Sequence, residues 1–321
     1  MSTIEQAARR LEQLRRADSQ LPVASATDDS AAKPAVESRK VPGPVLAMQA
    51  LERTPIVPAE APVTPARRDS QRASPETEQR IRQQPHVEID LPRLSAMGYV
   101  TPHSPRSRLA DEFRVVKRPL LMNAHGKSAS SIERANRIMI TSSMPGEGKT
   151  FVSINLSMSL AMELDTTVLL VDADAARPAV LDRLGLRPAK GLLDVLTEPE
   201  LELADVLLKT NVERLTILPA GTQQERATEL LASASMNALV EELASRYPDR
   251  IVVFDAPPLI ASTESRVLAA HMGQVILVVE ADRTPQSSVV EALATVENCP
   301  VVMTLLNKAP SSEVGYGYYG Y

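Results

Sequence analysis

The stretch Ile138-Met-Ile-Thr-Ser-Ser-Met-Pro-Gly-Glu-Gly-Lys-Thr150 decides the fold, because a short apolar run leads directly into a glycine-rich loop. Gly146 and Gly148 allow the backbone to wrap closely around phosphate groups, and the helix expected to follow adds its positive amino end. Lys149 is expected to reach the β and γ phosphates, and the hydroxyl of Thr150 to bind Mg²⁺. The stretch therefore predicts a nucleotide-binding loop.

Similar apolar runs recur along the chain and alternate with longer helical patterns. This alternation predicts an α/β fold, in which a mostly parallel sheet is covered by helices on both faces. Such a sheet binds its ligands at the carboxyl ends of the strands, where the glycine-rich loop lies. The expected strands are residues 138–141, 168–171, 215–218, 251–254, 275–279 and 301–305.

Two of these expected strands end in aspartates. Asp172 and Asp174 follow the strand 168–171, and Asp255 ends the strand 251–254. A buried strand that runs into carboxylates is unfavourable unless a cation lies opposite, and Mg²⁺ bound to ATP would provide one. We therefore expect the three carboxylates to converge at one edge of the sheet. For Asp172 and Asp174, the alternative is capping of a following helix.

The composition excludes several classes of protein. Of the 321 residues, 44% are hydrophobic and 23% are charged, and no uncharged apolar run approaches the roughly 18 residues that span a bilayer. The amino terminus lacks the apolar segment of a secretory signal, and the single cysteine cannot form an intrachain disulfide, so we expect a cytoplasmic protein. The net charge of −5 and the scattered histidines favour neither nucleic-acid binding nor a His or Cys metal site.

The chain divides by composition into several segments. Apolar residues from Ile4 to Leu14 follow helical spacing and predict a short amphipathic helix. A segment rich in proline and alanine comes next and predicts a disordered linker. A later helix that begins at Ser107 is expected to stop at Pro119. The expected boundaries are 1–18 for the first helix, 19–87 for the linker, 88–310 for the catalytic domain and 311–321 for a tail.

The tail holds most of the tyrosines. Tyr316, Tyr318, Tyr319 and Tyr321 are interleaved with glycine and cannot contribute to a core. One interpretation is that the tail accepts a phosphoryl group from nucleotide bound at the loop. The other is a disordered tail with adhesive tyrosines. The nucleotide-binding loop favours the first interpretation.

Four features together resemble the bacterial protein-tyrosine kinases (BY-kinases) of exopolysaccharide and capsule synthesis, and particularly the exosortase-associated tyrosine autokinases. They are Ser143-Met-Pro-Gly-Glu-Gly-Lys-Thr150 as a Walker A motif, Leu170-Val-Asp-Ala-Asp174 as Walker A′, Val253-Phe-Asp-Ala-Pro-Pro258 as Walker B, and the tyrosine-rich tail. The resemblance covers roughly residues 90–321 and implies a P-loop NTPase fold like that of the MinD/ParA ATPases. Within Walker A, Ser143 stands where the general pattern has its first glycine.

The resemblance implies an ATP- and Mg²⁺-dependent kinase that phosphorylates its own tail in trans and thereby regulates exopolysaccharide polymerisation and export. Catalytic roles are implied for Asp172, Lys149 and Asp174, with Asp172 activating the tyrosine hydroxyl. The implied metal ligands are Thr150, Asp174 and Asp255. The residues implied to bind nucleotide are Ser143, Pro145, Gly146, Glu147, Gly148, Lys149, Thr150, Phe151 and Asn307, the last at the place where related ATPases recognise adenine.

The resemblance also implies partners. Glu112, Arg114 and Lys117 are similar to the helix motif that forms the contact between protomers in the family, so a homo-oligomer is implied; an exposed charged helix face is the alternative. An inner-membrane polysaccharide co-polymerase and a tyrosine phosphatase are the other implied partners, which would place the protein peripherally at the inner membrane. The main rival function is an ATPase switch of the MinD/ParA kind, but the position of the signature lysine of those ATPases is Met144 here.

Overall fold

The computed structural model describes residues 85–102, 107–128, 130–245 and 250–310, and an eight-stranded sheet forms its centre. The strand order is β1-β4-β5-β3-β6-β2-β7-β8, and neighbouring strands are parallel except for the antiparallel pair β4 and β5. The strands are β1 (His86–Val87), β2 (Arg137–Ser142), β3 (Thr167–Asp172), β4 (Leu208–Thr210), β5 (Leu215–Leu218), β6 (Arg250–Asp255), β7 (Gln274–Glu280) and β8 (Val301–Asn307).

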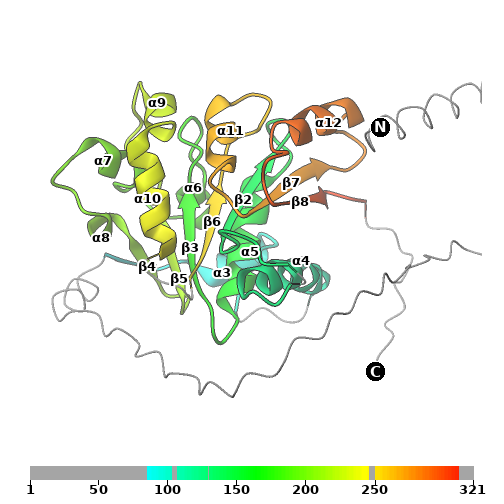
Figure 1. Cartoon of the computed structure of the whole chain (residues 1–321). Coiled ribbons are helices and arrows are strands. Elements are labelled where there is room, and N and C mark those ends of the chain that lie inside the picture. The colour runs from blue at the N-terminus through cyan, green and yellow to red at the C-terminus, as the bar shows by residue number, and fades with distance from the viewer. Residues whose placement is uncertain (1–84, 103–106, 129, 246–249, 311–321) are drawn as a thin grey trace, which may run out of the picture. The chain divides into compact units, whose positions relative to one another are not determined.

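Helices cover both faces of the sheet, because the strands are apolar on both sides. Along β2, Ile138 and Ile140 belong to the core on one face, and Met139 belongs to the core on the other. Helices α3, α4 and α5 lie on the first face, and α10, α11 and α12 lie on the second (Figure 1). The helices are α3 (Leu91–Ala96), α4 (Arg108–Ala124), α5 (Lys149–Ala161), α6 (Val180–Leu184), α7 (Leu192–Thr197), α8 (Leu203–Val206), α9 (Ala227–Leu231), α10 (Ala234–Ser245), α11 (Thr263–Ala269) and α12 (Gln286–Ala294).

Helix α5 starts directly after the glycine-rich loop and is packed on every side. All its residues from Val152 to Ala161 are buried, including several serines. Asn155, also buried, accepts a hydrogen bond from the N–H of Val100 at 2.7 Å and donates one to the carbonyl of Phe151 at 2.8 Å. The loop is therefore attached to an element with little freedom to move.

Helix α4 is longer than the sequence predicted. We expected it to stop at Pro119, but it continues to Ala124 with the proline inside. Pro119 cannot donate to the carbonyl of Val115, yet both residues lie on the exposed side of the helix, where water can bond that carbonyl. The opposite side of α4, with Phe113 and Leu120, is buried in the core.

The six predicted strands are confirmed, with small changes at their ends. The short strands β1 and β4 were not predicted. The amphipathic helix 1–18, the linker up to residue 84 and the tail 311–321 lie outside the described residues.

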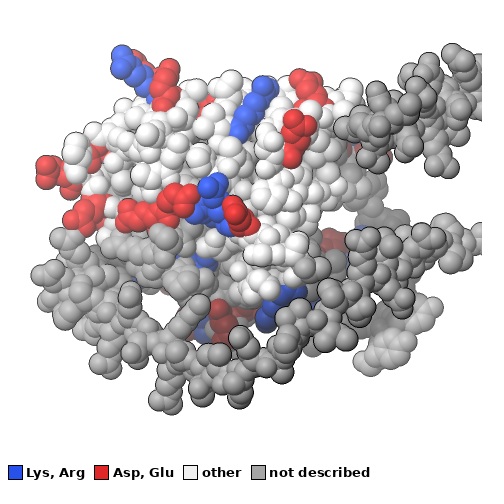
Figure 2. Space-filling view, viewed as in Figure 1, with Lys and Arg blue, Asp and Glu red and all other residues white. Residues whose placement is uncertain are grey.

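No helix in the described part of the chain is both long and apolar enough to cross a membrane. On the face that Figure 2 shows, acidic and basic side chains of the described residues are interspersed, and much of the surface between them is uncharged. This surface offers no broad area of a single charge on that face.

Candidate active site

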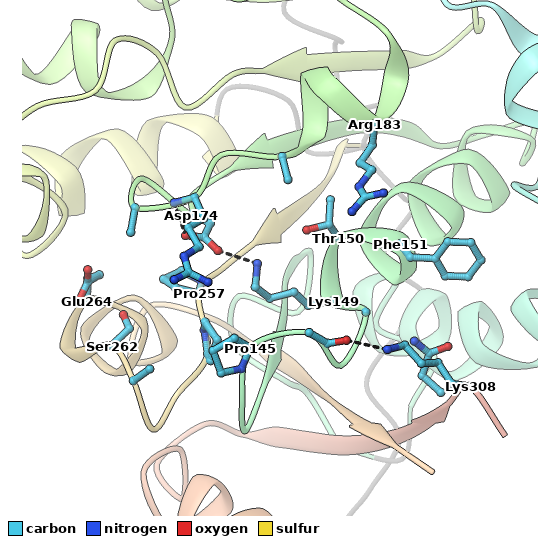
Figure 3. Close-up of a pocket in the computed structure, with 18 of the residues that line it drawn as sticks. Pro145, Lys149, Thr150, Phe151, Asp174, Arg183, Pro257, Ser262, Glu264 and Lys308 are labelled. Carbon is cyan, nitrogen blue, oxygen red and sulfur yellow. Dashed lines mark hydrogen bonds and ion pairs between the residues drawn. The ribbon is translucent and has the colours of Figure 1, made fainter. Parts of the chain in front are cut away.

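A cavity of about 870 Å³ lies beside the loop that joins β2 to α5 (Figure 3). Gly146 and Gly148 have φ angles of 92° and 98°, which glycine adopts without the strain that other residues would have. The cavity is therefore next to a backbone that only this glycine pattern forms easily. Of the residues predicted to bind nucleotide, those on its wall are Pro145, Gly146, Gly148, Lys149, Thr150, Phe151 and Asn307.

Lys149 and Asp174 form an ion pair on the wall of this cavity (Figure 3). The distance from Lys149 Nζ to Asp174 Oδ2 is 2.6 Å, and the two side chains are 13% and 5% exposed. Burial lowers the pKa of Lys149, but the carboxylates of Asp255 and Asp174 outweigh burial and raise it. The lysine is therefore charged, and a phosphate oxygen is an anion that can replace Asp174 as its partner.

Asp255, at the end of β6, is fully buried and has one oxygen without a partner. Ser153 Oγ donates to Asp255 Oδ1 at 3.0 Å, whereas Oδ2 has no hydrogen bond in the described part of the chain. Burial raises the pKa of this carboxyl, and the charge of Lys149 opposes that effect. A cation would satisfy the free oxygen, so Asp255 and the hydroxyl of Thr150 fit a Mg²⁺ position.

The carboxylates do not form a complete metal site by themselves. No group of three or more His, Cys, Asp or Glu side chains within the described ranges could hold a metal ion. Asp174 is engaged by Lys149 instead of standing free. The remaining ligands of a metal ion here must therefore be phosphate oxygens and water, which is the usual arrangement for Mg²⁺ bound with a nucleotide.

Asp172 is not on the wall of the cavity. It is 1% exposed, and its oxygens accept the backbone N–H groups of Ala179 and Val180 at 3.0 Å and of Asp174 at 3.3 Å. Burial and the neighbouring Asp255 raise the pKa of Asp172 to about 7, against the effect of these donors. Asp172 thus anchors the segment between β3 and α6, and its expected role toward a tyrosine hydroxyl stays a prediction, because the tail lies outside the described residues.

Ser143 and Glu147, which we expected to bind nucleotide, are buried and do not line the cavity. Glu147 is 2% exposed, and its carboxylate accepts hydrogen bonds from the N–H of Met144, at 2.7 Å, and from the hydroxyl of Thr284. Ser143 is completely buried. The side chain of Glu147 therefore holds the loop in shape and ties it to the segment after β7, and nucleotide binding by these two residues stays a prediction for their backbone.

Several wall residues were not found by sequence reasoning. The ring of Tyr99 contacts that of Phe151, with centroids 5.0 Å apart. Arg183, on α6, extends toward Thr150 (Figure 3). Lys308 directly follows the predicted Asn307, and this adjacency was the only available signal. Tyr99 and Arg183 come to this wall from distant positions in the chain, so local patterns carried no information about them.

The three residues predicted to form a protomer contact do not share one exposed face. Glu112 and Arg114 are exposed on α4 and pair with neighbours on the same helix. Lys117 is 7% exposed; its Nζ donates to the carbonyl of Ser159 at 2.7 Å and lies 2.6 Å from Glu163 Oε1. Lys117 is therefore corrected from an interface residue to an anchor between α4 and the end of α5.

Comparison with known proteins points to one family. A family model described as an AAA domain matches residues 135–305, which include the glycine-rich loop and both aspartate motifs. The tyrosine-protein kinase YwqD of Bacillus subtilis is 29% identical over 219 residues, which cover 67% of this chain and 88% of YwqD. The tyrosine-protein kinase CpsD of Streptococcus agalactiae is 31% identical over 193 residues, covering 58% and 82%. The crystal structure of the VpsO kinase domain, 29% identical, matches with a TM-score of 0.54 over 63% of this chain and 96% of that domain.

Proposed function

Because the chain belongs to the AAA-domain family of bacterial tyrosine-protein kinases, we propose that it is an autokinase, which transfers the γ-phosphoryl group of ATP to its own tail. The observation that carries the proposal is the cavity at the glycine-rich loop, where Lys149 and Asp174 face each other. The proposed acceptors are Tyr316, Tyr318, Tyr319 and Tyr321, which lie outside the described residues.

The charges of the cavity suit ATP with Mg²⁺. Loop amides and Lys149 would bind the phosphates, and the exchange of Asp174 for a phosphate oxygen would free that carboxylate. Thr150, Asp174 and Asp255 would then hold Mg²⁺, which supplies positive charge that neutralises the phosphate oxygens. The unpartnered oxygen of Asp255 supports this assignment.

In the transfer, the tyrosine oxygen forms a bond to the γ-phosphorus while the bond from phosphorus to the bridging oxygen of ADP breaks, and the hydroxyl proton passes to a carboxylate. Asp172 remains the proposed proton acceptor, because a pKa of about 7 suits that task near neutral pH. This role requires the segment 173–179 to open, since backbone N–H groups occupy both oxygens of Asp172. Asp174, already on the wall, is the competing acceptor.

Mass spectrometry of the tail peptide, after the full chain is incubated with Mg²⁺ and ATP, tests the proposal. Phosphate should appear on the tail tyrosines of the wild type and be absent from a Lys149→Met control, in which the cation that binds the phosphates is lost. An Asp172→Asn variant should lose transfer while ADP still binds if Asp172 accepts the proton, whereas transfer that persists in this variant would favour Asp174. ATP hydrolysis with an unmodified tail, alone and with the membrane partner, would favour the ATPase switch.

We also propose that transfer occurs in trans between protomers, with the exposed Glu112 and Arg114 of α4 at the contact. A Lys149→Met chain with an intact tail is mixed with an active chain that ends at residue 310. Phosphate on the tail of the Lys149→Met chain is the expected result. An unlabelled tail in this mixture would refute transfer in trans.

The cellular role that we propose is control of exopolysaccharide polymerisation and export at the inner membrane. The motif resemblance supports this role, as well as membership of the exosortase-associated group. It requires a separate inner-membrane co-polymerase as docking partner and a tyrosine phosphatase that resets the tail. Co-purification of the chain with the co-polymerase tests the partnership, and the polymer length in a Lys149→Met strain tests the role.

A further inference from the structure

The end of strand β8 contacts the glycine-rich loop on the wall of the cavity. Asn307 Nδ2 donates to the carbonyl oxygen of Glu147 at 2.8 Å. Lys308 Nζ donates to the carbonyl oxygen of Gly146, also at 2.8 Å (Figure 3). Two consecutive carbonyls of the loop are thus held by two consecutive residues that lie about 160 positions further along the chain.

These two hydrogen bonds determine where the next two amide groups point. In a planar trans peptide, the carbonyl and the N–H point in opposite directions. Because the carbonyls of Gly146 and Glu147 point toward the β8 end, the N–H groups of Glu147 and Gly148 point away from it. Neither of these N–H groups donates to a backbone carbonyl in the described part of the chain. Successive free N–H groups of this kind form an anion-binding concavity.

The contact is closely fitted. A Cβ atom on Gly148 would lie 2.1 Å from Asn307 Nδ2, so the amide of Asn307 occupies the space that a side chain would need. Lys308 is held in place by Glu280, whose Oε2 lies 3.1 Å from Lys308 Nζ. Arg283 also pairs with Glu280, at 3.3 Å, and has no hydrogen bond to the loop in the described part of the chain.

We propose that Asn307 and Lys308 are positioning residues for phosphate binding, which aim the N–H groups of Glu147 and Gly148 at the nucleotide. The inference rests on the proposed function, because it assumes that this loop binds nucleoside phosphates. It assigns Asn307 a role through the loop backbone instead of contact with the base. Glu280 supports the same role, since its carboxylate holds the ammonium group of Lys308 in place.

Calorimetric titration of the full chain with ADP and Mg²⁺ tests the proposal. Lys308→Met and Asn307→Ala should each raise the Kd for ADP by roughly tenfold, the effect of losing one hydrogen bond that organises the site. Lys308→Arg should restore most of the affinity, because it keeps a cationic donor. Arg283→Met is the matched control and should change Kd by less than about twofold, since it removes the other cation of Glu280 at an exposed position.

Glu280→Gln separates positioning from direct attraction. If Lys308 acts through the loop, loss of its Glu280 partner should weaken ADP binding, as Lys308→Met does. If Lys308 binds phosphate directly, removal of a negative charge beside it should tighten ADP binding, and the proposal is overturned. A Lys308→Met chain with wild-type Kd also overturns it. Failure of the wild-type chain to bind ADP would instead refute the proposed function. Thermal melting of each variant without nucleotide confirms that it is folded.

Discussion

Replacing Asp172 with asparagine should remove a large part of the pH dependence of this chain's stability between about pH 4 and about pH 7. Asp172 is 1% exposed, and burial together with Asp255 raises its pKa from 3.8 to about 7. In the unfolded chain, the carboxyl ionises near its ordinary value. Between these two values the folded state keeps a proton that the unfolded state has released, so the free energy of unfolding falls as pH rises.

The size of the effect follows from the pKa change and the hydrogen bonds. A rise to about 7 corresponds to a loss of at most ~4 kcal/mol of stability across the window. Asparagine avoids this loss but has one acceptor oxygen. That oxygen can still accept the N–H groups of Ala179 and Val180. The amide nitrogen of the asparagine, itself a donor, would then face the N–H of Asp174, which costs about 1 to 2 kcal/mol. The two proteins should therefore be about equally stable near pH 5, and the variant should be the more stable one near pH 8.

Urea denaturation of the nucleotide-free full chain, at steps from about pH 5 to about pH 8, measures this divergence. The difference between the two proteins cancels the contributions of groups that do not interact with Asp172, such as His271. Asp194→Asn is the control: burial alone would raise the pKa of Asp194, but hydrogen bonds from Thr222 and Gly191 lower it. That variant should lose stability equally across the window. Parallel pH profiles for wild type and Asp172→Asn would refute the reasoning.

Three further substitutions test other parts of the structure. Lys117→Met should lower the free energy of unfolding by about 1 to 3 kcal/mol, because it leaves the carbonyl of Ser159 and the carboxylate of Glu163 unpaired. It should leave the oligomeric state unchanged, and sedimentation that showed dissociation at unaltered stability would contradict this. Gln274→Leu should lower the free energy of unfolding, measured by urea denaturation, by about 2 to 4 kcal/mol, because this fully buried amide donates to two backbone carbonyls. A loss below ~1 kcal/mol would contradict this and show that the surroundings relax. Gly148→Ala should weaken ADP binding at least tenfold by calorimetry, because the new Cβ would displace Asn307 and because the φ angle of 98° at residue 148 disfavours alanine. An unchanged Kd would contradict the close fit.

The parts of the fold that could be predicted are those whose signal is local. Each predicted strand is a short apolar run, and the absence of alternation accounts for burial on both faces of β2, β3 and β6, whereas β8 at the edge is only partly buried. The short strands β1 and β4 carry too few residues to show a pattern, and they exist because β5 offers an edge. Pro119 was misjudged because the helix-breaking rule ignores exposure: water replaces the lost donor on the outer side of α4.

The candidate site shows the same division. Lys149 and Asp174 could be predicted because each stands at a fixed place after a strand. The pairing of Glu147 with Thr284, 137 residues away, depends on which strands are neighbours in the sheet, and no local pattern contains that information. Lys117 is a different case. Its spacing from Phe113 and Leu120 already placed it on the buried side of α4, so the sequence contained a signal that the motif resemblance concealed.

The burial of helix α5 from Val152 to Ala161 has a consequence for how ligand binding can be observed. Amide hydrogens from Val152 to Ala161 can exchange with solvent only when the surrounding helices and sheet open together, because no side of this helix faces water. A ligand held at the first turn of α5 stabilises the closed state by mass action and slows that opening. Protection from hydrogen exchange should therefore rise along the whole helix when ADP binds, well beyond the residues that contact it.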